Sequence, residues 1–204
     1  MSKKGNSNQA CTLKSNVVFF ATGNTHKFNE ARSILNPMGF AVALLRVKGD
    51  EIQSDNLKYI AQTSAANAYR HSKLPIFVED AGLFIEALDG FPGPYAAYVY
   101  KTIHNRGILH LMEGIEDRRA TFRSAIAYVD ETLEGPRCFE GESKGEITAT
   151  ERLQQGKTAF GFDPIFQPAG SGKSFAEMTI EEKNGYSHRA TALRKFADWY
   201  KTRH

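Results

Sequence analysis

Short apolar runs alternate with amphipathic segments along the first half of the chain. Runs rich in β-branched and aromatic residues at 16–21, 40–47 and 75–79 predict three buried strands, which end at polar, acidic or glycine residues. Apolar side chains recur at helical spacing in residues 26–35 and 56–71 and predict two helices. The order strand, helix, strand, helix, strand predicts an α/β fold.

The second half of the chain has a different pattern. A tight loop is expected at residues 90–94 (G-F-P-G-P), followed by a helix over 95–112 that is interrupted near Gly107. Two long alternating segments at 119–129 and 137–148 predict a β-hairpin. An amphipathic helix closes the chain. The candidate N-caps of the main helices are Asn24 or Thr25, Ser54 or Asp55, and Ser187 or Thr191.

Composition places the chain among ordinary globular proteins. It has 204 residues, of which 41% are hydrophobic and 24% charged, and this length suffices for a core without disulfides. With no internal repeat or linker, residues 16–204 are expected to form a single domain whose two lobes share one sheet. Neither a membrane span nor a secretory signal is evident, and Cys11 and Cys138 indicate no disulfide framework, so we expect a cytoplasmic protein.

The net charge of +3 resides in the N-terminal segment. Lys3, Lys4 and Lys14 carry the whole excess, and the rest of the chain is formally neutral. We interpret residues 1–15 as a disordered polar tail. Because a nucleic-acid-binding domain needs a basic body, we expect neither nucleic acid nor a membrane as a partner.

The segment T-G-N-T-H-K at residues 22–27 stands between an expected strand and an expected helix. Gly23 lets backbone N–H groups approach an anion, the helix N-terminus adds a positive dipole, and Lys27 adds a full charge. The segment is not a Walker A loop, which needs a second Gly before the Lys. It therefore indicates a phosphate-binding turn, and the alternative is a capped turn with an exposed lysine.

Carboxylates follow the third expected strand. Glu79 and Asp80 are expected at its carboxyl end, where α/β sheets bind ligands, and Glu51 follows the second strand. Such side chains are candidate Mg²⁺ ligands, or a base that activates water. For an isolated pair of acids, simple solvation is the alternative.

Two further clusters carry candidate chemistry. Lys183, His188 and Arg189 surround the start of the last helix, where cations oppose the helix dipole, so we expect an anion or a carbonyl-bearing ligand to compensate them. Phe160 and Phe162, in F-G-F-D, can sandwich a flat base, and the adjacent aspartate can accept from ring N–H groups. Exposed cations and inward-facing aromatics are the alternatives.

Seven motifs occur in a single order along the chain. They are T-G-N-T-H-K-F-N-E, D-E-I-Q, E-D-A-G-L, G-F-P-G-P-Y, F-G-F-D-P-I-F, F-A-E-M and E-E-K-N-G-Y-S-H-R-A. Together they resemble the inosine triphosphate pyrophosphatase family, whose members cleanse nucleotide pools of non-standard purine nucleoside triphosphates. The resemblance covers residues 17–200, and its first and last motifs are the most specific.

The resemblance implies a long mixed β-sheet with flanking helices that form two lobes around a central cleft, usually in a homodimer. It implies hydrolysis of ITP, dITP or XTP to the monophosphate and pyrophosphate with Mg²⁺. Asp80 falls on the family's general-base position, and Glu51 and Asp80 fall on its metal positions. The family's substrate contacts fall on Thr22, Gly23, Asn24, Thr25, His26, Lys27, Ala81, Phe160, Gly161, Phe162, Asp163, Lys183, His188 and Arg189.

If the resemblance holds, we expect the protein to discriminate between purine bases by the group at position 6. Lys183 and Arg189 donate hydrogen bonds only, so they pair with the 6-carbonyl of hypoxanthine or xanthine and oppose the 6-amino group of adenine. Glu79 is a candidate further metal ligand. Many family members carry Ser where this chain has Ala81, and a backbone contact survives that change whereas a hydroxyl contact does not.

Three other functions stay open. The chain can be a non-enzymatic nucleotide- or RNA-binding module, a hydrolase of canonical or pyrimidine triphosphates, or a dimer module with an inactive site. The acids at positions 51, 79 and 80 argue against the binding module, because carboxylates repel a polyanion unless a metal intervenes.

Overall fold

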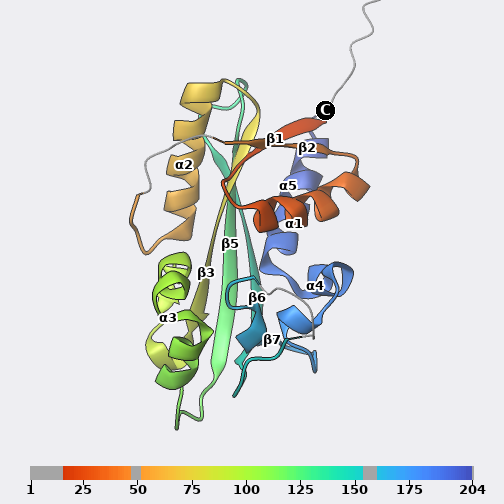
Figure 1. Cartoon of the computed structure of the whole chain (residues 1–204). Coiled ribbons are helices and arrows are strands. Elements are labelled where there is room, and N and C mark those ends of the chain that lie inside the picture. Colours follow the sequence, from red (N-terminus) through yellow and green to blue (C-terminus); the bar gives the residue numbers. More distant parts are fainter. Residues whose placement is uncertain (1–15, 47–51, 154–159, 204) are drawn as a thin grey trace, which may run out of the picture.

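The computed structural model of the protein describes residues 16–46, 52–153 and 160–203, so the predicted tail (1–15) and Glu51 lie outside the described residues. One seven-stranded sheet has the order β2-β1-β3-β5-β6-β7, with β4 paired to β3 (Figure 1). The strands are β1 (Val17–Ala21), β2 (Ala41–Leu45), β3 (Ile76–Ile85), β4 (Pro92–Gly93), β5 (Arg119–Val129), β6 (Arg137–Ile147) and β7 (Phe166–Pro168). The helices are α1 (Thr25–Leu35), α2 (Leu57–Ser72), α3 (Ala96–Leu111), α4 (Ile180–Tyr186) and α5 (His188–Lys201).

The sheet is mixed. β1 runs parallel to β2 and β3, and the crossovers through α1 and α2 allow this, since parallel neighbours need a long connection. β3, β5, β6 and β7 pair antiparallel, with the predicted hairpin as β5 and β6. The expected α/β fold with a long mixed sheet and flanking helices is therefore confirmed.

Strand β3 is longer than the sequence indicated. It runs to Ile85, so the prediction that it ends at Glu79 was wrong. The ladder with β5 continues without interruption from Ile76 to Ile85, which lies opposite Ala120. A buried acid is rare inside a strand unless partner charges compensate it, and for Glu79 these partners, Lys27 and Arg189, come from elsewhere in the chain.

The other edge of β3 is paired only in part. β1 pairs with it as far as Phe77, and β4, which lies in the tight loop predicted at 90–94, pairs with it from Leu83. Within the described residues no strand covers the edge of residues 78–82, which we call the open edge of β3. Glu79 and Asp80 lie on this open edge, just past the end of the parallel pairing.

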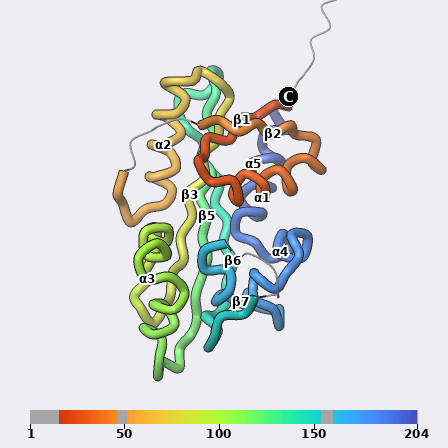
Figure 2. The backbone as a smooth tube through the Cα atoms, in the orientation of Figure 1, coloured from red at the N-terminus to blue at the C-terminus, as the bar shows by residue number. Residues whose placement is uncertain are grey.

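The two ends of the sheet carry separate cores. One buried cluster packs α1 and α5 against β1, β3 and β5, and includes Phe20 and Phe77, whose rings stack at 4.4 Å. The other packs α3 and β7 around Leu83 and Phe122. α2 covers the sheet at the first end through a row of alanines. The backbone trace shows β3, β5 and β6 running through both lobes (Figure 2).

Helix starts follow the capping residues closely. Asn24 caps α1 and Ser187 caps α5, as predicted among the alternatives. α2 is capped by Asn56 rather than by Ser54 or Asp55, because Asn56 Oδ1 accepts from the Tyr59 N–H at 3.1 Å. In the part of the chain that the structure describes, no helix is long and apolar enough to cross a membrane.

Helix α3 is broken at His104, whose φ of 55° and ψ of −168° lie outside the helical region. The sequence predicted the interruption three residues later, at Gly107. This glycine belongs to the same break, because a Cβ at position 107 would lie 2.4 Å from the Cβ of Ile103. Only glycine fits against the displaced turn.

Candidate active site

A cavity of about 660 Å³ lies at the open edge of β3, between the first turns of α1 and α3 and the loop around residues 160–163. Its volume is typical of small-molecule sites, which span roughly 300–1,000 Å³. It brings together the following predicted residues: Asn24, His26, Lys27, Asp80, Ala81, Phe160, Gly161, Phe162, Asp163, His188 and Arg189. Among the described residues, the predicted contacts that do not line it are Thr22, Gly23, Thr25 and Lys183.

The turn between β1 and α1 presents a helix N-terminus to the cavity. Asn24 Oδ1 accepts from the Lys27 N–H at 3.1 Å, and Thr22 Oγ1 accepts from the Asn24 N–H at 3.1 Å. Gly23 is exposed, and a Cβ there would meet no atom within 4 Å. Thr22 and Gly23 therefore shape the turn, while Asn24, His26 and Lys27 face the cavity.

Lys27 connects α1 to the open edge of β3. Its Nζ lies 2.9 Å from Glu79 Oε2 and donates to the Glu79 carbonyl at 3.3 Å. Because backbone groups alternate in direction along a strand, the N–H and C=O of Ala81 point to the same open edge as the Glu79 carbonyl. Residue 81 therefore offers its backbone to the cavity whether it is Ala or Ser.

A buried ionic network holds the start of α5. The Arg189 side chain is 3% exposed, its Nε lies 3.1 Å from Glu79 Oε1, and its Nη1 donates to Glu30. Lys183 Nζ lies 2.7 Å from the other oxygen of Glu30 and 2.6 Å from Asp163 Oδ2. A bound ligand was expected to compensate these cations, but carboxylates of the chain itself do so.

The network sets the charge state of its carboxylates. Burial alone would raise the pKa of Glu30, but the charges of Arg189 and Lys183 outweigh burial and lower it to about 2. Burial also opposes ionisation of Glu79, and the charges of Arg189 and Lys27 nevertheless hold its pKa well below its ordinary range. Both groups are therefore ionised at neutral pH and neutralise the cations around them.

His188 presents a neutral ring to the cavity. Burial, with the charge of Arg189, lowers the pKa of its imidazole to about 3. The ring stacks on Phe122 at 4.8 Å and 8°. Its Nδ1 is buried and has no hydrogen-bond partner in the described part of the chain. Buried polar atoms rarely stay unpaired, so this nitrogen is one of the few exceptions within the described residues.

The aromatic pair does not form the predicted sandwich. Phe162 is 4% exposed and packs edge-on against Tyr100 at 5.5 Å, within the core of the second lobe. Phe160 is half-buried and stacks with His26 at 5.2 Å and 26°. Phe160, backed by His26, is therefore the surface on which a flat base can stack.

The carboxylates differ in their fit to a metal. Asp80 lines the cavity, and carboxylate oxygens are the ligands that Mg²⁺ prefers. Glu79 does not fit, because its oxygens are held by Lys27, Arg189 and Ser124. The described residues contain no group of three or more side chains suited to a metal ion, and the other predicted ligand, Glu51, lies outside them.

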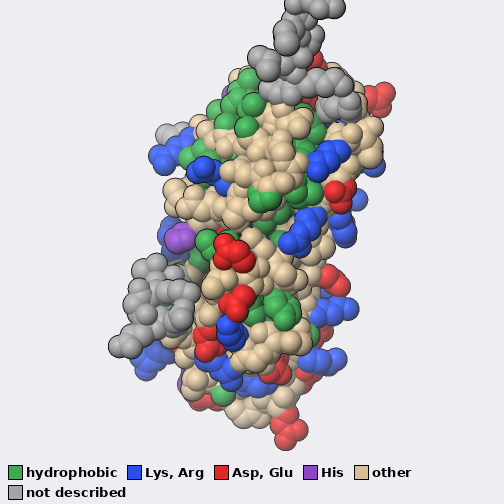
Figure 3. Space-filling model, turned by 90° about the vertical axis from the view of Figure 1, so that its right-hand side faces the viewer, with side chains coloured by type: hydrophobic (Ala, Val, Ile, Leu, Met, Phe, Trp, Pro, Cys, Tyr) green, Lys and Arg blue, Asp and Glu red, His purple; other side chains and the backbone are tan. Residues whose placement is uncertain are grey.

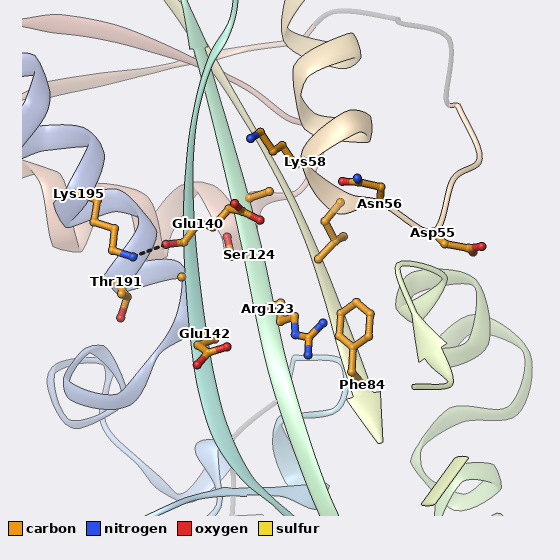
Figure 4. A pocket seen from close by; sticks show the side chains of 13 residues that line it. Asp55, Asn56, Lys58, Phe84, Arg123, Ser124, Glu140, Glu142, Thr191 and Lys195 are labelled. Carbon is orange, nitrogen blue, oxygen red and sulfur yellow. Dashed lines mark hydrogen bonds between the residues drawn. The ribbon is translucent and has the colours of Figure 1, made fainter. Parts of the chain in front are cut away.

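The remaining surface is mixed in charge. On the face seen in Figure 3, basic and acidic side chains are interspersed. A second cavity of about 590 Å³ lies beside α2, β6 and α5 (Figure 4). In it Arg123 lies over the ring of Phe84, 4.5 Å from its centroid, and Lys195 donates to the Glu140 carbonyl at 2.8 Å. It contains none of the predicted site residues.

Sequence reasoning missed two kinds of site residue. Glu30 and Ser124 hold the buried cations and Glu79, and Tyr98, Tyr100 and Lys101 line the cavity from α3. Glu30 follows Lys27 by three positions, so it shares a helix face with a predicted contact, and this signal was readable. The residues of α3 gave no such signal, since their place depends on how the helix docks.

Fold and site together define an α/β protein whose cleft combines a helix N-terminus, buried cations, an aromatic platform and a carboxylate. The model of the Ham1 family matches residues 18–199. Two relatives named dITP/XTP pyrophosphatase, from Methanopyrus kandleri and Thermococcus kodakarensis, are each 48% identical over 184 and 182 residues, which is 90% and 89% of this chain and 96% of each relative. The chain belongs to the Ham1 family.

Solved structures agree with this assignment. A Ham1 protein from Coxiella burnetii is 26% identical, with a TM-score of 0.78 over 91% of this chain and 98% of its own. A nucleoside-triphosphatase / dITP/XTP pyrophosphatase from Mycobacterium abscessus is 29% identical, with a TM-score of 0.67 over 88% and 98% of the two chains. The fold predicted from the sequence resemblance is therefore the fold of these proteins.

Proposed function

We propose that the protein hydrolyses the non-standard purine nucleoside triphosphates ITP, dITP and XTP to the monophosphate and pyrophosphate, with Mg²⁺, and so removes them from the nucleotide pool. The observation that carries the proposal is the cavity that gathers Asp80, the first turn of α1 and Arg189. The name of the relatives, dITP/XTP pyrophosphatase, supports the same activity.

In this proposal the triphosphate binds at the turn from Thr22 to Lys27. N–H groups at the start of α1 and the helix dipole favour an anion there. Lys27 stabilises the charge that develops on the departing pyrophosphate. The exposed Gly23 leaves the backbone of the turn accessible to the phosphates.

Asp80 is the proposed catalytic residue. A water molecule attacks the α-phosphorus, the bond to the bridging oxygen breaks, and pyrophosphate leaves. Asp80 orients that water and accepts its proton. Held by Asp80 and Glu51, Mg²⁺ would neutralise phosphate charge and lower the pKa of bound water.

Arg189 is the residue proposed to recognise the base. A guanidinium has five N–H donors, and Glu30 and Glu79 take only some of them, which leaves donors for a 6-carbonyl. The 6-amino group of adenine is itself a donor, so it would face the guanidinium N–H groups without forming a hydrogen bond. Lys183 is a positioning residue in this proposal, because it holds Glu30 and Asp163 behind the cavity. Phe160 provides the stacking surface.

The test is pyrophosphate release from ITP, XTP, GTP, ATP and dTTP, with Mg²⁺ and with EDTA. Metal-dependent release from ITP and XTP, far above GTP and ATP, supports the proposal. Equal release from all five would indicate a different nucleotide pool. Binding without turnover, weakening steeply with salt, would favour a nucleotide- or RNA-binding module.

We also propose that the enzyme acts in the cytoplasm as a homodimer. The support is the resemblance to a family whose members are usually dimeric, together with only two cysteines far apart in the sequence. Light scattering on the purified chain distinguishes a dimer from a monomer.

A further inference from the structure

Helix α3 supplies a wall of the cavity that carries a cation. Ala97 and Lys101 both line the cavity, and they lie one helical turn apart on the same face of the helix. Long side chains on a helix lean toward its N-terminus. Lys101 therefore borders the cavity from the same helix face as Ala97, whose methyl group takes up little space beside it.

The cations around the cavity differ in how far their charge is compensated. Lys27, Lys183 and Arg189 each contact one or two carboxylates of the chain within 3.1 Å. Lys101, in contrast, takes part in no ion pair with a carboxylate of the residues that the structure describes, and it is exposed. Its charge remains available to a bound anion.

The charge balance of the site leaves a need for such a cation. Three cations (Lys27, Lys183 and Arg189) face four carboxylates, which are Glu30, Glu79, Asp80 and Asp163. Because carboxylates already compensate these three cations, the network leaves little net positive charge for a bound triphosphate. Beside the proposed Mg²⁺, a cation outside this network would favour the phosphate chain, and Lys101 lines the cavity where it can contribute that charge.

We propose that Lys101 binds the phosphate chain of the nucleotide, as a second phosphate-binding lysine that faces the cavity from α3. This inference depends on the proposed function only for the identity of the ligand, a nucleoside triphosphate. An ammonium group that no carboxylate compensates can bind any linear phosphate chain in this cavity.

The test compares Lys101→Met with Lys101→Arg and with the exposed control Lys201→Met. Calorimetry with inorganic tripolyphosphate and, separately, with inosine shows which part of the ligand the side chain contacts. We expect Lys101→Met to weaken tripolyphosphate binding about 10-fold or more and to leave inosine binding unchanged. Lys101→Arg restores most of the affinity, and Lys201→Met has no effect.

Three outcomes overturn the inference. They are unchanged tripolyphosphate binding in Lys101→Met, an equal loss for tripolyphosphate and inosine, and an equal loss in Lys201→Met. In turnover, the same variant raises KM for ITP and leaves kcat within about 2-fold, since its contact is made equally in ground and transition states. Because tripolyphosphate binding needs no hydrolysis, failure of the proposed function (no pyrophosphate from any nucleotide) stays separate from failure of this inference.

Discussion

Replacement of Glu30 by glutamine tests the buried network most sharply. The Glu30 carboxylate bridges Lys183 and Arg189, and its side chain is 13% exposed. Glu30→Gln keeps the shape of the side chain but leaves two buried cations short of one counter-charge. The fall of the Glu30 pKa from its ordinary value of 4.5 to about 2 corresponds to about 3 kcal/mol of stabilisation at neutral pH. Removal of one partner of a buried ion pair costs about 3–5 kcal/mol, which agrees.

The assay is urea unfolding of wild type and Glu30→Gln across a range of pH. Glu30 has a lower pKa in the folded than in the unfolded state, so its contribution is complete above pH 4.5 and is lost as pH falls toward 2. The difference in unfolding free energy should therefore be about 3 kcal/mol at pH 7 and shrink below pH 4.5. Glu113→Gln, in an exposed pair with His110, should change stability by less than about 0.5 kcal/mol. A difference below about 1 kcal/mol at pH 7, or one independent of pH, would show that Glu30 is not a stabilising counter-charge of Lys183 and Arg189.

Three further predictions concern the cavity. Asp80→Asn keeps the shape of the side chain and removes its charge, so kcat for ITP should fall about 100-fold or more with an unchanged urea midpoint, and near-normal turnover would contradict the role of Asp80. Phe160→Ala should raise KM for ITP about 5- to 100-fold through lost stacking, at wild-type stability. Phe162→Ala, in the core, should instead destabilise the fold by about 3–5 kcal/mol in urea unfolding. If Phe160→Ala lowers stability and Phe162→Ala raises only KM, then Phe162 is the stacking residue and Phe160 the core residue.

The order of elements was readable from the sequence because each element has a local cause. Apolar runs, helical spacing and side-chain caps are short-range signals, and Asn24 and Ser187 cap helices as predicted. The end of β3 was misjudged because Glu79 and Asp80 look like a solvated strand end. The tertiary partners Arg189 and Lys27 compensate Glu79 inside the strand, and they come from distant segments.

The sequence predicted which residues belong to the candidate site better than it predicted the role of each residue. Motif order identified Lys183 and Phe162, yet the first lies behind the cavity and the second packs in a lobe core. The role of each residue depends on which carboxylate or ring of a distant segment packs against it, and the sequence pattern does not predict that packing. Glu30 was given no task for the same reason, since its contacts with Lys183 and Arg189 join distant segments, and the place of Lys101 depends on how α3 docks.

The position of the bond that the enzyme breaks decides whether Asp80 and Lys27 act as proposed. ITP is hydrolysed with Mg²⁺ in water labelled with oxygen-18, and the products are separated and weighed by mass spectrometry. If Asp80 directs water to the α-phosphorus, the label enters inosine monophosphate and the pyrophosphate carries none. Label in pyrophosphate, or release of orthophosphate, would place the attack at another phosphorus and contradict the assignment of Asp80 and Lys27.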